Sequence, residues 1–278
     1  MTVQDPNILN PFTLLDPSIA STTSLLITVV SVFFCCLISF YFFRSYRFSG
    51  FRYLLGLPMG FTILGISFVF EHLSLMFYAH GILYSLFFWV QMALVSEALA
   101  LIALSYLLKN RINNRSDDAD ASAPDQGLPS KLLLGHKTSA KARDIFISVL
   151  PMVVISIPFM VPISALFVQQ FLNYTELADL SFYIRIFNMI ILGYIFKSTI
   201  VSLVKAANIK LLYVPAAFAS LWLEQYSLMI IYFDNNLAAF IGSLIARLVG
   251  LAVFIYAIHY ATSGVTRGNI EIEAREKT

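Results

Sequence analysis

The sequence predicts an all-α integral membrane protein: a polytopic bundle of seven transmembrane helices, N-terminus outside and C-terminus in the cytoplasm. Three observations support this fold class. The 278-residue chain is 59% hydrophobic and 12% charged, whereas soluble domains carry about 25% charged residues. Seven apolar segments are each long enough to cross a hydrocarbon core, which needs about 20 helical residues. The basic residues outside these segments all fall into alternate connections, as the positive-inside rule requires.

The predicted spans follow one another in a single membrane domain. Residues 1–20 form a proline-containing lead outside the membrane and lack the basic start of a cleavable signal peptide. Seven spans leave too few residues for a second folded domain. The spans are placed at 21–43, 53–76, 82–108, 145–168, 181–204, 211–233 and 237–261.

Several local features support the predicted spans and the way they are connected. The run 21–43 is too long for the apolar core of a signal peptide, so it is expected to stay in the membrane. A short turn joins 53–76 to 82–108, and a three-residue turn joins 211–233 to 237–261, which predicts two helical hairpins. Prolines 158 and 162 are expected to bend the fourth span, because proline removes a helical hydrogen bond.

The composition changes sharply on leaving the third span. Residues 110–140 are rich in Asp, Ser, Asn, Gly and Pro, so we expect a disordered cytoplasmic loop. The polar tail 262–278 is expected to be a short helix or disordered. These two segments carry seven of the 15 basic residues on the predicted cytoplasmic side.

The distribution of basic residues sets the orientation. Of the 18 Lys and Arg residues, three lie within the predicted spans. The other 15 fall in the connections after the first, third and fifth spans and in the tail. The remaining segments outside the spans contain no Lys or Arg, and together they carry five acidic residues: Asp5, Asp16, Glu176, Asp179 and Asp234. The cytoplasmic face is therefore basic, which suits anionic lipid headgroups and is no evidence for nucleic acid.

Six ionisable residues lie within the predicted spans. Each costs about 2.5–3.5 kcal/mol near mid-bilayer, so each is expected to face protein or water and to have a partner. Their depths, at about 1.5 Å per residue, match in three acid–base pairs. The predicted pairs are Glu71–Arg185, Glu97–Lys197 and Glu224–Arg247. Two interpretations stay open. The pairs hold neighbouring helices together, or they line a polar pocket or proton path.

The stretch WLEQY, residues 222–226, is the densest polar and aromatic cluster in any predicted span. Trp222 and Tyr226 are four residues apart and share one helix face, with Glu224 and Gln225 to its sides. This stretch is the first candidate for contact with a ligand.

The outer end of the predicted hairpin formed by 53–76 and 82–108 contains Glu71, His72 and His80. Imidazole is a ligand for Zn, Cu and Fe, but the spacing matches no metal-binding motif. A helix cap or a pH-sensitive patch is favoured over a metal site, and no cofactor is predicted. Cys35 and Cys36 are adjacent within the first span and are expected to be ordinary buried or lipid-facing thiols.

Two seven-helix families with this topology lack matching residues here. A microbial rhodopsin needs a lysine in its seventh helix for retinal, and this chain has Arg247 there and no lysine in that span. Receptors coupled to G proteins usually end their third helix in an Asp-Arg-Tyr-like triplet and their seventh in Asn-Pro-x-x-Tyr. The corresponding stretches here are SYLLKNR and AVFIYAIHY.

The stretch RYLLGLPMGFTILGISFVFEHLSLMF, residues 52–77, resembles the second helix of the seven-helix membrane sensor regions in prokaryotic, particularly archaeal, signalling proteins. It has an arginine at its inner edge, then glycines and small residues, then a polar cluster outside. In such proteins the membrane region feeds a cytoplasmic kinase or binding domain. This chain has only a short polar tail, so the resemblance implies a stand-alone sensor or adaptor that needs a separate partner.

Three function classes follow. The first is a non-enzymatic sensor or adaptor in the cell membrane, in contact with lipids and with a cytoplasmic or membrane protein partner. The second is a small secondary transporter that uses the intramembrane charge pairs. The third is an accessory subunit of a membrane enzyme complex. Catalysis by the chain itself is disfavoured, because no nucleophile elbow, paired-aspartate motif or clear metal triad is present.

Overall fold

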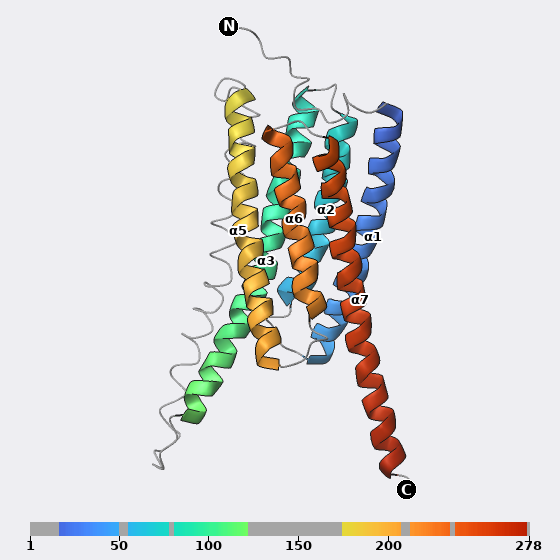
Figure 1. Ribbon diagram of the computed structural model, residues 1–278, viewed down its shortest axis with the longest axis vertical. Coiled ribbons are helices and arrows are strands. Elements are labelled where there is room, and N and C mark those ends of the chain that lie inside the picture. Colours follow the sequence, from blue (N-terminus) through green and yellow to red (C-terminus); the bar gives the residue numbers. More distant parts are fainter. Residues whose placement is uncertain are drawn as a thin grey trace.

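The computed structural model shows a bundle of long, roughly parallel and antiparallel helices (Figure 1). It describes residues 17–49, 55–77, 81–121, 174–206, 212–233 and 237–276. These residues are helical almost throughout and include no strand. The helices are α1 (Pro17–Ser49), α2 (Gly56–Met76), α3 (Gly81–Ala121), α5 (Tyr174–Ala206), α6 (Tyr213–Phe233) and α7 (Leu237–Glu276).

Six helices of the described chain are long and apolar enough to cross a membrane, so the protein is a multi-pass membrane protein. Their boundaries agree with the predicted spans to within a few residues. The fourth predicted span, 145–168, lies outside the described residues. The presence of this span, the total of seven spans and the direction of insertion therefore stay predictions. The spans are Thr22–Phe48, Gly56–Met76, Leu83–Lys109, Ser181–Val204, Tyr213–Ile231 and Ala238–Tyr260.

The six helices make a closed ring of contacts. Each helix packs on the next along the chain, with α5 following α3, and α7 returns to pack on α1. The most extensive contacts are within the two hairpins, α2–α3 and α6–α7. The core is continuous across the ring, because one cluster of buried apolar side chains draws on all six helices.

Small residues allow α2 and α3 to approach closely. A Cβ atom on Gly60 would lie 2.9 Å from the carbonyl oxygen of Ala98 and 2.6 Å from the side chain of Ile102. Close backbone approach at small residues is a common basis of helix association in membranes, where burial from water contributes little. Gly60 therefore fixes the separation of these two helices.

Five aromatic rings link five helices in the half of the bundle where α2 begins. Phe61 stacks on Phe42 at 5.8 Å between ring centroids and meets Phe254 edge-on at 5.1 Å. Phe218 meets Phe254 edge-on at 4.7 Å and Tyr106 at 5.9 Å. Such geometry suits the ring quadrupoles. We call these five residues the aromatic layer.

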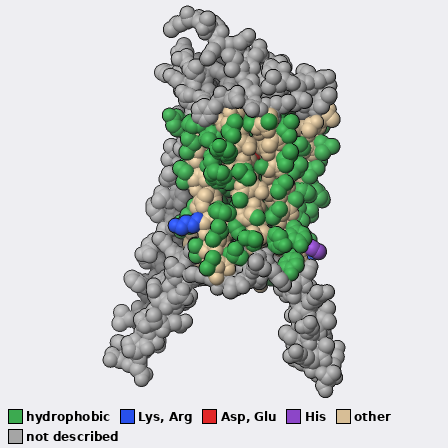
Figure 2. Space-filling model, viewed as in Figure 1, with side chains coloured by type: hydrophobic (Ala, Val, Ile, Leu, Met, Phe, Trp, Pro, Cys, Tyr) green, Lys and Arg blue, Asp and Glu red, His purple; other side chains and the backbone are tan. Residues whose placement is uncertain are grey.

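The outer surface of the bundle is apolar, as lipid contact requires. On the face shown in Figure 2, hydrophobic side chains cover most of the described surface, and only small basic and histidine patches appear, near its lower edge. Large apolar side chains point outward, among them Phe33 at 57% exposure, Ile190 at 65% and Val204 at 72%. A soluble domain would rarely expose so large a continuous apolar surface.

Two of the helices run well beyond their apolar spans. The expected disordered loop at 110–140 is wrong for its first part, because α3 continues to Ala121. The tail 262–278 forms a helix up to Glu276 and belongs to α7. Extending a helix that is already nucleated in the membrane requires only propagation. Both extensions leave the same end of the bundle and diverge (Figure 1).

Candidate functional site

Arg247 on α7 is the most deeply buried charged residue of the described bundle, with 1% of its side chain exposed. Its Nε atom donates to Glu224 Oε1 on α6 at 2.7 Å. Its Nη2 atom donates to Glu71 Oε1 on α2 at 2.9 Å, and Nη1 lies 2.7 Å from Glu71 Oε2. The guanidinium group thus binds one carboxylate with two nitrogens and a second carboxylate with the third. Arginine suits this arrangement because its donors form a rigid planar fork.

The face of the guanidinium group is covered by an aromatic ring. The Cζ atom of Arg247 lies 4.2 Å from the ring centroid of Phe68. Phe68 precedes Glu71 by three residues, so one face of α2 provides both the ring and the carboxylate. The cation–π contact adds stabilisation that is largest where water is excluded.

The two hairpins bring these residues to one level. Glu224 lies nine residues before the end of α6 at Phe233, and Arg247 lies ten residues after the start of α7 at Leu237. At about 1.5 Å per residue, both are roughly 14 Å from the turn that joins them. Glu71 is only five residues from the end of α2 at Met76, and the long arginine side chain spans the remaining height.

A second arginine brings the site to formal neutrality. Glu71 and Glu224 carry two negative charges against one on Arg247. Arg185 on α5 interacts electrostatically with both carboxylates, although no ion pair with a described residue is formed by its side chain. We call Glu71, Arg185, Glu224 and Arg247 the charge cluster. Its formal charge sums to zero, which is the condition for keeping four charges in a hydrocarbon environment.

Uncharged polar groups continue the site along α5 and α3. Asn188 is fully buried one turn after Arg185, and its Oδ1 atom accepts a 2.6 Å hydrogen bond from Ser96 on α3. Gln225 is buried beside Glu224. A void of about 10 Å3 touches Glu224 and Gln225, which is the size of about one water molecule's probe sphere.

The structure confirms one predicted charge pair, gives Glu71 a different ion-pair partner, and shows no ion pair between the described side chains of Glu97 and Lys197. Glu224 contacts Arg247, as their matched depths on neighbouring helices predict. Glu71 binds Arg247 and not Arg185. Which arginine Glu71 contacts depends on the direction in which each side chain points around its helix axis. Depth in the membrane does not specify that direction.

The predicted pair Glu97–Lys197 is wrong for the same reason. Lys197 is exposed on α5, about 200° around the helix from the buried Ile195. Glu97 is partly buried on α3, and no ion pair joins these two described side chains. Equal depth does not bring them face to face.

The WLEQY stretch divides between two faces of α6. Trp222 and Tyr226 stack in parallel, with ring centroids 5.8 Å apart, and 40% of Tyr226 is exposed. Glu224 and Gln225 are buried on the opposite side. Only the acid and the amide therefore belong to the interior site. Trp222 is partly buried and packs against the apolar core, and Tyr226 faces outward.

The histidines predicted as weak metal candidates are not assembled with other ligands in what the structure describes. His72 is buried on α2 beside Glu71, and His80 lies outside the described residues. Among the described side chains, no group of three His, Cys, Asp or Glu residues is arranged to hold a metal ion. Cys35 is buried, Cys36 is exposed, and both are free thiols.

Phe68, which covers the guanidinium group of Arg247, was not among the residues predicted from the sequence. Its position three residues before Glu71 was the available signal, but the chain has 25 phenylalanines, and most of them are expected to face lipid or to pack between helices. Comparisons with protein-family models, with curated proteins and with solved structures find no match for this chain.

Proposed function

We propose that this protein is a seven-helix membrane sensor or adaptor that acts on a separate partner protein, with its N-terminus outside and its C-terminus in the cytoplasm. One observation carries the proposal: α7 holds Arg247 in the charge cluster and also continues unbroken beyond the membrane to Glu276. A movement of Arg247 within the bundle is thereby transmitted to the protruding end of the same helix. The chain acts in the cell membrane and catalyses no reaction itself.

The lengths of the extensions support an output role. The membrane span of α7 ends at Tyr260 and that of α3 at Lys109. The helices continue for 16 and 12 residues, to Glu276 and Ala121, which is about 24 Å and 18 Å. Two helices that leave the same end of the bundle offer a surface on which a partner can read their relative position.

The charge cluster has the properties of a switch. A buried ion pair contributes little net stability, because desolvation offsets much of the Coulomb energy, whereas loss of one partner is costly. Changing one charge among these residues would therefore shift the balance between two packings of α2, α6 and α7. The void beside Glu224 is too small for a solute, which favours a switch over a transport path at this level.

The resemblance of residues 52–77 to the second helix of prokaryotic membrane sensor regions is consistent with this role. Glu71, which lies in that stretch, is a member of the charge cluster. In this proposal the partner supplies the output domain that such sensors carry on their own chain.

The proposal can be tested by measuring distances between the two extensions. Spin labels at Arg115→Cys and Arg267→Cys, in a Cys35→Ala, Cys36→Ala background, report the separation of α3 and α7 by double electron–electron resonance in lipid nanodiscs. Glu224→Gln removes one carboxylate charge from Arg247 and is expected to change the distance distribution. Glu97→Gln is the matched control, because it neutralises a carboxylate of α3 that is outside the cluster.

Gly264→Pro sharpens this measurement, because proline breaks the helix between the membrane and the label. In the Gly264→Pro background, Glu224→Gln should no longer change the distance distribution in the way it does in the intact helix. Identical distributions for wild type and Glu224→Gln, with both proteins folded, would contradict the proposed coupling.

A small proton-coupled transporter is the second candidate, and the two buried carboxylates on one arginine favour it. Intramembrane acids of this kind commonly lie on ion or proton paths. Proton flux into liposomes from purified, partner-free protein, abolished by Glu224→Gln and kept by Glu97→Gln, would replace the sensor proposal with this one.

A further inference from the structure

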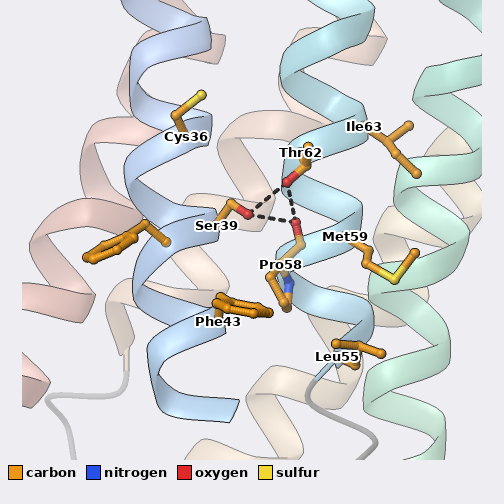
Figure 3. Close-up of a pocket in the computed structure, with 9 residues that line it drawn as sticks. Cys36, Ser39, Phe43, Leu55, Pro58, Met59, Thr62 and Ile63 are labelled. Atoms are coloured by element: carbon orange, nitrogen blue, oxygen red, sulfur yellow. Dashed lines mark hydrogen bonds between the residues drawn. The ribbon is translucent and has the colours of Figure 1, made fainter. Parts of the chain in front are cut away.

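A groove opens on the lipid-facing side between α1 and α2, away from the charge cluster. Its volume is about 460 Å3, within the range of about 300–1,000 Å3 that is usual for small-molecule sites. Figure 3 shows the groove, with Phe43 reaching from α1 toward Pro58 at the start of α2. Phe40 at 61% exposure and Met59 at 45% form its apolar rim.

The polar atoms in the groove wall are satisfied within the wall. Ser39 Oγ donates to the carbonyl oxygen of Pro58 at 2.9 Å, and Thr62 Oγ1 donates to the same oxygen at 2.8 Å. The two hydroxyl oxygens lie 2.8 Å apart (Figure 3). Because these groups do not need water, the groove can hold hydrocarbon without leaving a polar group unsatisfied.

The residues that line the groove are uncharged, and two arginines of α1 follow beyond its end. Cys36, Phe40, Phe43 and Arg47 follow one another at steps of four, three and four residues, so they form one stripe along α1. Arg44 lies one turn after Phe40, and both arginines are exposed. The apolar stripe of the groove therefore leads directly to two positive charges at the end of the membrane span, which closes at Phe48.

We propose that this groove binds one anionic phospholipid, with an acyl chain against Phe40 and Met59 and with the phosphate group beside Arg44 and Arg47. The apolar length and the cationic end match the two parts of such a lipid. The charge distinguishes it from a zwitterionic lipid, because basic residues near a membrane surface attract anionic headgroups. This site is independent of the charge cluster and of the sensor function proposed above.

Photo-cross-linking of the full-length protein in lipid vesicles tests the proposal. The vesicles contain phosphatidylcholine and phosphatidylglycerol, and a trace of either lipid carries an acyl-chain diazirine. Mass spectrometry then measures labelling of the α1 and α2 peptides. We expect phosphatidylglycerol to label them severalfold more than phosphatidylcholine does. Equal labelling by the two lipids would overturn the proposal, because the groove would then hold bulk lipid.

Variants separate the headgroup site from the acyl-chain site. Arg44→Gln with Arg47→Gln should abolish the severalfold preference for phosphatidylglycerol, because even one basic residue near the surface changes the affinity for an anionic lipid about fivefold. Lys109→Gln removes a cation from the same end of α3 and should keep the preference. Met59→Trp fills the groove and should reduce labelling of these peptides by both lipids. A preference that survives loss of both arginines, or labelling unchanged by Met59→Trp, would overturn the proposal.

A salt titration keeps the test valid if the double variant does not fold. Raising the salt on the wild-type protein from about 0.15 M to about 1 M shortens the screening length from about 8 Å to about 3 Å. The preference for phosphatidylglycerol should then disappear while total labelling remains. A preference that is independent of salt would contradict the role of the arginines.

Discussion

Two levels of the same bundle hold their helices together by different physics. The charge cluster joins α2, α6 and α7 through Glu71, Glu224 and Arg247, and the aromatic layer joins the same three helices through Phe61, Phe218 and Phe254. On α7 the two levels are seven residues apart, Arg247 to Phe254, or about 10 Å. Each of the three helices therefore contributes one residue to an ionic contact and one to a contact between rings.

The comparison shows which level of the bundle tolerates a substitution and which level is sensitive to one. Contacts between rings depend on how well their shapes fit, because the hydrophobic effect contributes little inside a membrane. Their energy therefore changes gradually as the packing changes. Ionic contacts in the same environment depend on the presence of every charge, because an unpaired buried charge is costly. The charge cluster is thus the level at which a small chemical change can alter the packing.

Removal of the arginine should have the largest effect on this comparison. Arg247→Met keeps most of the side-chain volume and leaves two buried carboxylates without their cation. We expect a loss of about 3–5 kcal/mol in the free energy of unfolding, measured by steric trapping in bicelles. Lys197→Met, which removes an exposed cation from α5, is the control and should change stability little. A small loss for Arg247→Met would mean that the two carboxylates take up protons or water at no cost.

Truncation in the aromatic layer should have a smaller effect. Phe254→Ala removes the ring that contacts both Phe61 and Phe218. Soluble proteins lose about 3–5 kcal/mol for such a change, and a bilayer lacks the water-transfer part, so about 1–3 kcal/mol is expected. The same bicelle measurement on Phe33→Ala, at an outward-facing ring, should show almost no change. A loss for Phe254→Ala that exceeds that for Arg247→Met would reverse the comparison between the levels.

The uncharged hydrogen bond next to the cluster provides an intermediate case. Ser96→Ala removes the donor to Asn188 Oδ1, and membrane hydrogen bonds contribute about 0.6 kcal/mol on average. Unfolding in bicelles should therefore show a loss close to that value. Ser220→Ala, at a partly exposed hydroxyl on α6, is the matched control. A loss of several kcal/mol for Ser96→Ala would show that this bond belongs energetically to the charge cluster.

Replacing the whole ionic level should have the smallest net effect on stability. The quadruple variant Glu71→Leu, Arg185→Met, Glu224→Leu, Arg247→Met removes all four members of the charge cluster and leaves no unpaired charge at this level, and such replacements are often neutral or stabilising. We expect a stability within about 1 kcal/mol of wild type, together with loss of the response of α7 to charge. A quadruple variant as unstable as Arg247→Met would show that side-chain shape, and not charge, decides how the helices pack at this level.

Much of the fold could be predicted because its determinants are local. A run of about 20 apolar residues is enough to predict a span, and the described spans agree with the predicted ones to within a few residues. The helical continuation to Ala121 and Glu276 was harder to predict, because polar residues there give no apolar periodicity. Nucleation within the membrane, and not local composition, explains those extensions.

The candidate site could be predicted only in part. Two side chains form a pair only when they match in depth along their helices and also point toward each other around the helix axes. Depth follows from counting residues, and for Glu224 and Arg247 a three-residue turn brings two antiparallel helices into contact, so depth was sufficient. For Glu71, Glu97 and Lys197 the helices are not joined by so short a turn, and depth alone chose the wrong partners.

The sequence by itself determined a multi-pass helical membrane protein with acids and bases inside its spans, because the bilayer allows few alternatives to an apolar helix. Only the tertiary structure decided that one arginine binds two carboxylates under Phe68, and that Lys197 faces outward. The reason is the rotation of each helix about its own axis. That rotation is set by contacts among all six described helices, such as the close approach at Gly60, and by no single segment.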